Sequence, residues 1–106
     1  MTAYSLVVYS KPVAGREDEY NDWYTNVHLG DVLKIPGITS ARRYKAAAGQ
    51  DQTNPYLALY NVETNDITAL FTELSRRAAA GEMVISDAMA EANMVIFEAI
   101  TPEVTE

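Results

Sequence analysis

The pattern of hydrophobic and polar residues predicts four strands. Each of four segments is dense in β-branched and aromatic residues and is bounded by Pro, Gly or polar turns: 3–10, 38–46, 56–62 and 93–100. The polar segment 47–55 has the composition of a hairpin loop between the second and third of them. These two strands are therefore expected to pair directly.

Two other segments have the spacing of an amphipathic helix. The first begins at Arg16, and four of its residues share one face: Tyr20, Trp23, Tyr24 and Val27. Gly30 is expected to end or bend this helix, before Pro36-Gly37 stops a short apolar piece. The second helix has the apolar face Ile67, Leu70, Phe71 and Leu74, a cap among Thr64, Asn65 and Asp66, and a stop at Gly81.

The order β-α-β-β-α-β predicts one α+β domain over residues 1–106, with the four-stranded antiparallel sheet of the ferredoxin-like fold. The strands do not alternate cleanly, so both faces of the sheet are expected to be apolar. If the helices cover Leu6, Val8, Leu57 and Leu59, the opposite face carries Val7, Tyr9, Tyr56, Ala58 and Tyr60. Such an apolar face favours a sheet-to-sheet homodimer over a monomer with wet tyrosine hydroxyls.

Composition and charge exclude several classes of function. Eight Lys and Arg against 15 Asp and Glu give a net charge of -7, which argues against nucleic-acid binding. The apolar runs are too short to span a bilayer, and the first residues do not resemble a secretion signal, so a cytoplasmic location is expected. With no cysteine and a single histidine, we expect no metal centre, and any chemistry uses oxygen, nitrogen or a borrowed cofactor.

His28 is the candidate general acid or base, because its unperturbed pKa lies near neutrality. The alternative is a histidine at a helix end that caps carbonyl groups or packs beside Trp23. Asp31 is a candidate to orient the ring, although a solvated residue at a helix break is the other interpretation.

Several tyrosines could position a carbonyl group if they point into one cavity: Tyr9, Tyr24, Tyr44, Tyr56 and Tyr60. Packing in the core is the alternative for each of them. Arg42 and Arg43 occupy adjacent strand positions and therefore point to opposite faces, so only one of them can enter a cavity and hold a carboxylate or an enolate.

A motif runs from the first helix into the second strand: an aromatic pair, a histidine four residues on, and an aliphatic-Pro-Gly turn before a strand with Arg-Tyr. Its residues are Trp23-Tyr24, His28, Val32, Ile35-Pro36-Gly37-Ile38 and Arg43-Tyr44. In this motif the chain resembles the EthD-like branch of the dimeric α/β-barrel proteins. Leu29 and Asp31 depart from the pattern, since relatives often have Pro and an aliphatic residue there. The element order and the length agree over nearly the whole chain.

The resemblance implies a homodimeric α/β barrel with a small apolar cleft, and His28 matches a helix histidine that acts in acid–base catalysis in the isomerase branch. We therefore expect a cofactor-independent isomerase, cyclase or lyase for a small hydrophobic lactone, phenolic or polyketide-like compound. The expected catalytic residues are His28 and Tyr24, and the expected substrate-binding residues are Tyr9, Trp23, Asp31, Arg43, Tyr44 and Tyr60. The alternatives are a non-catalytic ligand-binding or accessory protein, and a haem protein with His28 as axial ligand.

Overall fold

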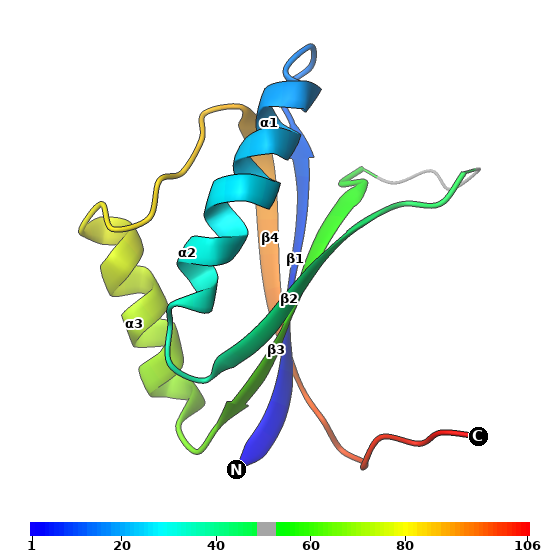
Figure 1. Ribbon diagram of the computed structural model, residues 1–106, viewed down its shortest axis with the longest axis vertical. Helices are drawn as coiled ribbons and strands as arrows, with labels where there is room; N and C mark the ends of the chain where they lie inside the picture. Colours follow the sequence, from blue (N-terminus) through cyan, green and yellow to red (C-terminus); the bar gives the residue numbers. More distant parts are fainter. Residues whose placement is uncertain (49–52) are drawn as a thin grey trace.

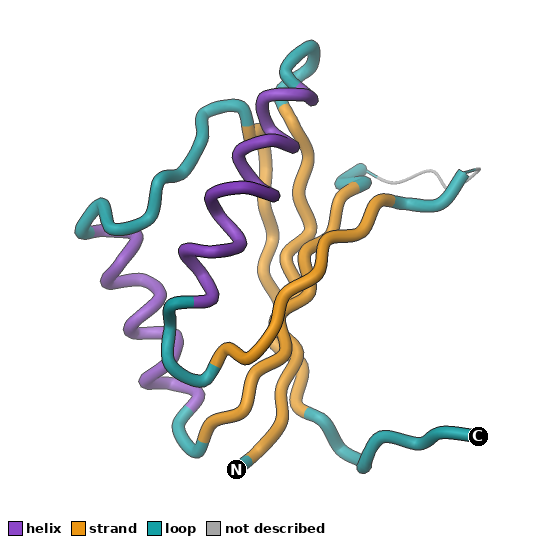
Figure 2. Tube along the Cα trace, in the orientation of Figure 1, coloured by secondary structure: helices purple, strands orange, loops and turns teal. Residues whose placement is uncertain are grey.

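The computed structural model describes residues 1–48 and 53–106 (Figure 1). Its elements in chain order are β1 (Thr2–Pro12), α1 (Glu17–Trp23), the π-helix η1 (Tyr24–His28), α2 (Leu29–Leu33), β2 (Ile38–Lys45), β3 (Tyr56–Thr64), α3 (Ile67–Ala79) and β4 (Met89–Glu98). The strands form one antiparallel sheet in the order β2-β3-β1-β4, and the helices lie on one side of it (Figure 2). The predicted ferredoxin-like fold is confirmed.

The sequence signals at the ends of the elements act as expected. Asp66 caps α3, because its Oδ1 accepts a hydrogen bond of 3.0 Å from the Ala69 amide. Gly37 has a φ of 100°, and a Cβ there would lie 3.2 Å from the Glu63 carbonyl oxygen. Only glycine suits this turn, which leads the chain from α2 into β2. Of the predicted loop 47–55, residues 49–52 lie outside the described residues.

The first helix differs from the prediction at Gly30. The helical path runs without interruption from Glu17 to Leu33, and Gly30 lies inside α2. The irregularity comes earlier, at Tyr24–His28, where the backbone forms a π-helix. Glycine weakens a helix only modestly, and the buried contacts of Val32 and Ile35 beyond it outweigh that cost.

The predicted facing of β3 is also wrong. In the register of β1 with β3, Leu6 pairs with Tyr60 and Val8 pairs with Ala58, so these four residues share the helix-covered face. Leu57 and Leu59 therefore lie on the opposite side of the sheet. The β3 residues on both sides of the sheet are largely apolar. The hydrophobic pattern therefore could not show which side faces the helices, because registers that differ by one residue both bury apolar side chains.

The side of the sheet away from the helices is largely apolar. We call it the open face; it carries Val7, Tyr9, Leu57, Leu59, Val95 and Phe97. Tyr9, Val95 and Phe97 are exposed there. The sequence-based expectation of an apolar second face is thus confirmed, although its residues from β3 differ from those expected.

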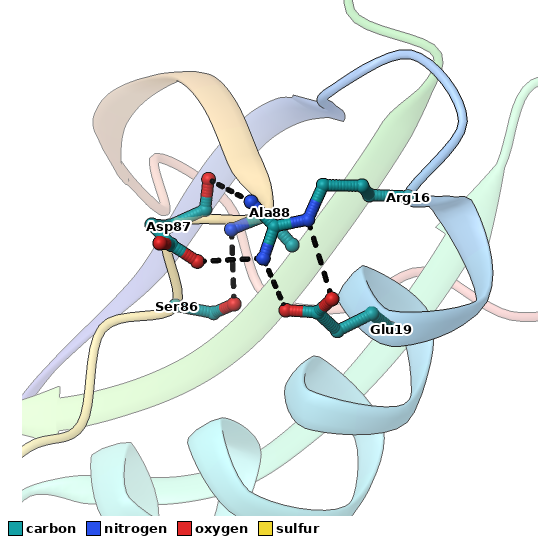
Figure 3. A network of polar contacts seen from close by, with 5 residues as sticks. All are labelled: Arg16, Glu19, Ser86, Asp87 and Ala88. Atoms are coloured by element: carbon teal, nitrogen blue, oxygen red, sulfur yellow. Dashed lines mark hydrogen bonds and ion pairs between the residues drawn. The ribbon is translucent and has the colours of Figure 1, made fainter.

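A polar cluster fastens the segment before β4 to the start of α1 (Figure 3). The Arg16 guanidinium bonds to both Glu19 and Asp87, at 2.7 Å from the Asp87 Oδ1. Nearby, the Val13 amide donates to the Ala88 carbonyl. These contacts bring residues 83–88 against the first helix, where Trp23 Nε1 donates to the Val84 carbonyl oxygen at 2.8 Å.

Among the helices of the described residues, none is long and apolar enough to cross a membrane.

Candidate functional site

Aromatic rings fill the space between the first helix and the sheet. Tyr20, Trp23 and Tyr24 point from the helix toward the sheet, as their spacing predicts, and all three are buried. Tyr60 reaches the same layer from β3, where it is 1% exposed. We call these four residues, together with His28, the aromatic cluster.

His28 lies at the last position of the π-helix and packs within the aromatic cluster. Its ring is stacked on Trp23, with centroids 4.7 Å apart, and meets the edge of Tyr24 at 5.0 Å. Its Nδ1 is buried and has no hydrogen-bond partner among the described residues. Burial lowers the pKa of His28 below its usual value, and the charge of Asp31 offsets this only partly. The imidazole is therefore neutral at pH 7 and able to accept a proton.

The hydroxyl groups of Tyr24 and Tyr60 are buried beside each other. Neither has a well-formed hydrogen bond in the part of the chain that the structure describes, although the two lie close enough that hydrogen bonding between them lowers the pKa of Tyr24 and raises that of Tyr60. Burial, more than any neighbouring group, raises the pKa of Tyr24 to about 12, and burial raises the pKa of Tyr60 as well. Both hydroxyls stay protonated at neutral pH and can donate a hydrogen bond.

The contrast with Tyr20 shows that these two hydroxyls are unusual. The Tyr20 hydroxyl is paired with Ser10 Oγ, a buried polar group on β1. Buried polar groups in native proteins are nearly always paired in this way, because an unpaired one costs about 1–3 kcal/mol. The three polar atoms without a well-formed hydrogen bond, on His28, Tyr24 and Tyr60, therefore mark this cluster as a candidate site for a ligand.

Arg43 enters the same layer from β2, while Arg42 is exposed on the other face. The prediction that the two arginines point in opposite directions is confirmed. The Arg43 guanidinium carbon lies 4.7 Å from the centre of the Tyr24 ring. Its Nη1 donates to Thr25 Oγ1 at 2.9 Å, and its Nη2 donates to Asn21 Oδ1 at 3.0 Å.

The structure brings together five of the residues selected from the sequence: Trp23, Tyr24, His28, Arg43 and Tyr60. Tyr9 and Tyr44 instead line a separate cleft of about 400 Å³ with Leu57 of the open face. Asp31 lies near enough to affect His28 electrostatically, but its carboxylate pairs with Lys34 at 3.5 Å. It makes no hydrogen bond to His28 Nδ1.

Sequence reasoning missed Asn21 and Thr25, the two residues that hold Arg43. They are four residues apart on one helix, so they share a face, and that face is the one next to Tyr20 and Tyr24. This spacing was a usable signal. It was overlooked because polar residues at such positions normally face solvent.

No protein-family model matches the chain. A segment of 55 residues is 40% identical to core atranone cluster (CAC) protein 1 from Stachybotrys chlorohalonatus (strain IBT 40285). The match covers 52% of this chain, and the chain spans only 22% of that protein's length. The likeness therefore concerns a part of a larger protein.

Solved structures with the same fold cover nearly all of the chain. The haem degrader MhuD of Mycobacterium tuberculosis, with two haems bound in its active site, matches with a TM-score of 0.67 at 13% identity, over 95% of this chain and 99% of that one. A dimeric ferredoxin-like protein of unknown function from Thermobifida fusca YX gives 0.60 at 16% identity, over 92% of both chains. An EthD family protein from Bacillus halodurans C-125 gives 0.53 at 14% identity, over 94% of this chain and 100% of that one.

The fold and these likenesses define the class of protein. It is a ferredoxin-like α+β protein, and the proteins that share its fold include dimeric members and an EthD family member. This agrees with the EthD-like resemblance of the Trp-Tyr, His and Pro-Gly motifs in the sequence.

Haem does not fit beside His28 in the closed arrangement of this structure. An axial ligand needs open space for a porphyrin beside the imidazole, but this ring is stacked on Trp23 and edge-on to Tyr24, and Tyr24 and Tyr60 are each 1% exposed. In the described part of the chain, no three His, Cys, Asp or Glu residues lie close enough to hold a metal ion.

Proposed function

We propose that the protein binds a small hydrophobic carbonyl compound at the aromatic cluster and moves a proton on it. The observation that supports this proposal is the group of three buried, unpaired polar atoms on His28, Tyr24 and Tyr60. Two of these residues supply hydroxyl donors, and the third supplies a neutral base. A ligand oxygen between the hydroxyls would give them the partner that the folded chain does not provide.

The chemistry of these three groups suits proton transfer next to a carbonyl. His28 takes a proton from the carbon beside the carbonyl, and the electron pair of the broken C–H bond moves toward the carbonyl oxygen. Tyr24 and Tyr60 donate hydrogen bonds to the enolate oxygen that forms, in an environment with little water. If the proton returns to a different atom of the ligand, the result is an isomerisation. If the enolate expels a neighbouring leaving group, the result is an elimination, and if it attacks a second carbonyl of the same molecule, the result is a cyclisation.

The aromatic cluster is closed in this structure, since Tyr24 and Tyr60 are almost fully buried. A ligand must therefore enter by a movement of the helix away from the sheet. The π-helical segment Tyr24–His28 suits such a movement, because single π-helical turns within α-helices are rare and are frequent at functional sites.

Ligand binding is the direct test of the proposal. In a thermal-shift screen of lactones, phenols and aryl ketones, a ligand at about 100 times its Kd should stabilise the wild type by about 2.7 kcal/mol. The Tyr24→Phe/Tyr60→Phe double variant should lose most of this shift, and the matched control Tyr4→Phe, which leaves the three unpaired atoms in place, should keep it. Equal shifts in all three proteins would contradict the proposal.

Two other outcomes of the same screen would favour the alternatives. A shift with haemin alone, together with a Soret band that His28→Ala removes, would indicate haem ligation at His28. The absence of any small-molecule hit would favour an accessory protein without a ligand at this site.

We further propose that two copies associate through their open faces. Exposed Val95 and Phe97 on β4 lie beside the apolar residues of β1 and β3, which makes a continuous apolar surface across the sheet. That a ferredoxin-like protein of the same fold is dimeric supports the association of two copies. When the open faces of two copies pack together, each copy buries the same residues, as an interface with two-fold symmetry requires.

A charge on the β4 side of the open face is expected to break the dimer. Val95→Lys places an ammonium group opposite the apolar surface of the partner, so the variant should sediment as a monomer at concentrations where the wild type is a dimer. Ser75→Lys, on the exposed side of α3, adds the same charge and should leave the dimer intact. Analytical ultracentrifugation of the three proteins makes the comparison, and a Val95→Lys dimer of unchanged stability would exclude this interface.

A further inference from the structure

Arg43 is held from several sides at once. Its guanidinium carbon lies 5.3 Å, 4.7 Å and 5.5 Å from the ring centres of Tyr20, Tyr24 and Tyr56. On the helix, Thr25 and Asn21 accept hydrogen bonds from its two terminal nitrogens. We call Arg43 and these five residues the arginine cage.

The hydrogen bonds of the arginine cage form a continuous connection between sheet and helix. Asn21, which accepts from Arg43, also donates through its Nδ2 to the Tyr56 hydroxyl at 3.4 Å, so β2, β3 and α1 are tied together at one point. The planar fork of an arginine suits this geometry, because it places two N–H groups in fixed directions while its faces meet aromatic rings. A lysine can supply the charge but not the fork.

This arrangement changes the role that Arg43 can have at the site. In the sequence it is a candidate for holding a carboxylate or an enolate. In the structure, each terminal nitrogen donates one hydrogen bond to a neutral acceptor of the protein, and the flat face of the guanidinium lies over the Tyr24 ring, so Arg43 is engaged within the fold. The two hydroxyls that lack partners belong to Tyr24 and Tyr60 instead.

We propose that Arg43 is a positioning residue that fixes the Tyr24 ring through the arginine cage, and that the site takes an uncharged carbonyl compound and not a carboxylate, because the donors without partners there are neutral hydroxyls. The second part of this inference rests on the proposed function. The first part does not, since it concerns contacts within the folded chain. The positive charge beside the Tyr24 ring also opposes the effect of burial on the hydroxyl, which keeps it a stronger donor than burial alone would allow.

The experiment distinguishes the positioning role of the Arg43 guanidinium from the effect of its positive charge. It compares four proteins: wild type, Arg43→Lys, Thr25→Val and the matched control Arg42→Lys. Arg42→Lys makes the same substitution one residue away, on the opposite face of the strand. Thr25→Val removes one acceptor of the guanidinium with little change of volume, so it tests the cage even if Arg43→Lys disturbs folding. NMR spectra of the Tyr24 ring and the Arg43 guanidinium report on the cage without any ligand.

We expect slowly exchanging Arg43 N–H signals and a shifted Tyr24 ring in the wild type and in Arg42→Lys. Thr25→Val should speed the exchange of the Arg43 N–H protons, and Arg43→Lys should move the Tyr24 ring signals toward those of a free tyrosine. Tyr24 signals that stay unchanged in both cage variants would overturn the positioning role.

Two probes of equal size then test the charge of the ligand: 4-hydroxyacetophenone, which is neutral, and 4-hydroxybenzoate, which carries a carboxylate. We expect the ketone to shift the Tyr24 and Tyr60 signals and to bind about tenfold more weakly to Arg43→Lys, a change that corresponds to about 1.4 kcal/mol. The benzoate should leave the Arg43 signals unmoved. Tighter binding of the benzoate, with shifted Arg43 signals, would overturn the inference. If neither probe reaches the cluster while the cage signals are as expected, the proposed function and the uncharged ligand fail and the positioning role stands.

Discussion

Replacing His28 with Gln is expected to lower kcat/KM about 10²–10⁴-fold, which is the usual contribution of a positioned general acid or base. Gln keeps a polar side chain beside Trp23 but cannot exchange a proton near neutral pH. The measurement is turnover of a compound identified by the ligand screen, with circular dichroism and sedimentation to show that fold and assembly are retained. Because the loss is in chemistry, ligand affinity should change much less than the rate.

The pH dependence of the wild type gives an independent check on His28. A base must be neutral, so kcat/KM should fall when the imidazole becomes protonated. Burial holds the pKa of His28 below its usual value of about 6.5, and the acid limb of the profile should therefore lie below that pH. Asp31 raises the pKa of His28, so Asp31→Asn should move the acid limb to still lower pH.

Two results would contradict the role of His28. Turnover of His28→Gln within a factor of about three of the wild type would remove it from the chemistry, given the size of effect that a general base contributes. An acid limb that persists in the variant at the same pH would show that another group titrates. The Asp31→Asn variant serves as the control, since it changes the electrostatics at His28 while leaving the imidazole in place.

The order of the elements and the face of each helix could be predicted from the sequence because each rests on a local pattern. The spacing of Tyr20, Trp23 and Tyr24 places three aromatic side chains on the buried face of one helix, whatever the rest of the chain does. The split of Arg42 and Arg43 between two faces follows equally from the period of a strand. His28 and Tyr24 belong to this local pattern, which is why the sequence could bring them together.

The features that the sequence could not supply depend on contacts between distant segments. Tyr60 joins Tyr24 only because β3 pairs with β1 in a register that places Tyr60 opposite Leu6. A shift of one residue would have placed Leu59 there, and both residues are apolar enough for either register. Tyr9 and Tyr44 lie outside the candidate site for a simpler reason, since the alternation of residues along β1 and β2 places both on the open face. Sequence pattern identifies aromatic residues, and strand register decides which of them meet.

Removing the hydroxyl of Tyr60 is expected to stabilise the protein, whereas removing that of Tyr20 is expected to destabilise it. Tyr60→Phe deletes a buried oxygen that has no partner among the described residues. The free energy of unfolding should therefore rise by about 1–3 kcal/mol, reduced by the cost of the small cavity that the missing oxygen leaves. Tyr20→Phe leaves buried Ser10 Oγ without its partner and should lower that free energy by a similar amount. Tyr24→Phe should behave as Tyr60→Phe does.

Urea unfolding of the three variants tests this prediction, because a shift of the midpoint at constant slope measures the change in stability. The same Tyr24→Phe and Tyr60→Phe variants should lose ligand binding, so that stability and function move in opposite directions at these two positions. Tyr20→Phe is the matched control, with the same chemical change in the same aromatic cluster at a hydroxyl that is paired. If Tyr60→Phe destabilises the chain as much as Tyr20→Phe, its hydroxyl is satisfied within the folded protein, and the case for a ligand oxygen at this position fails.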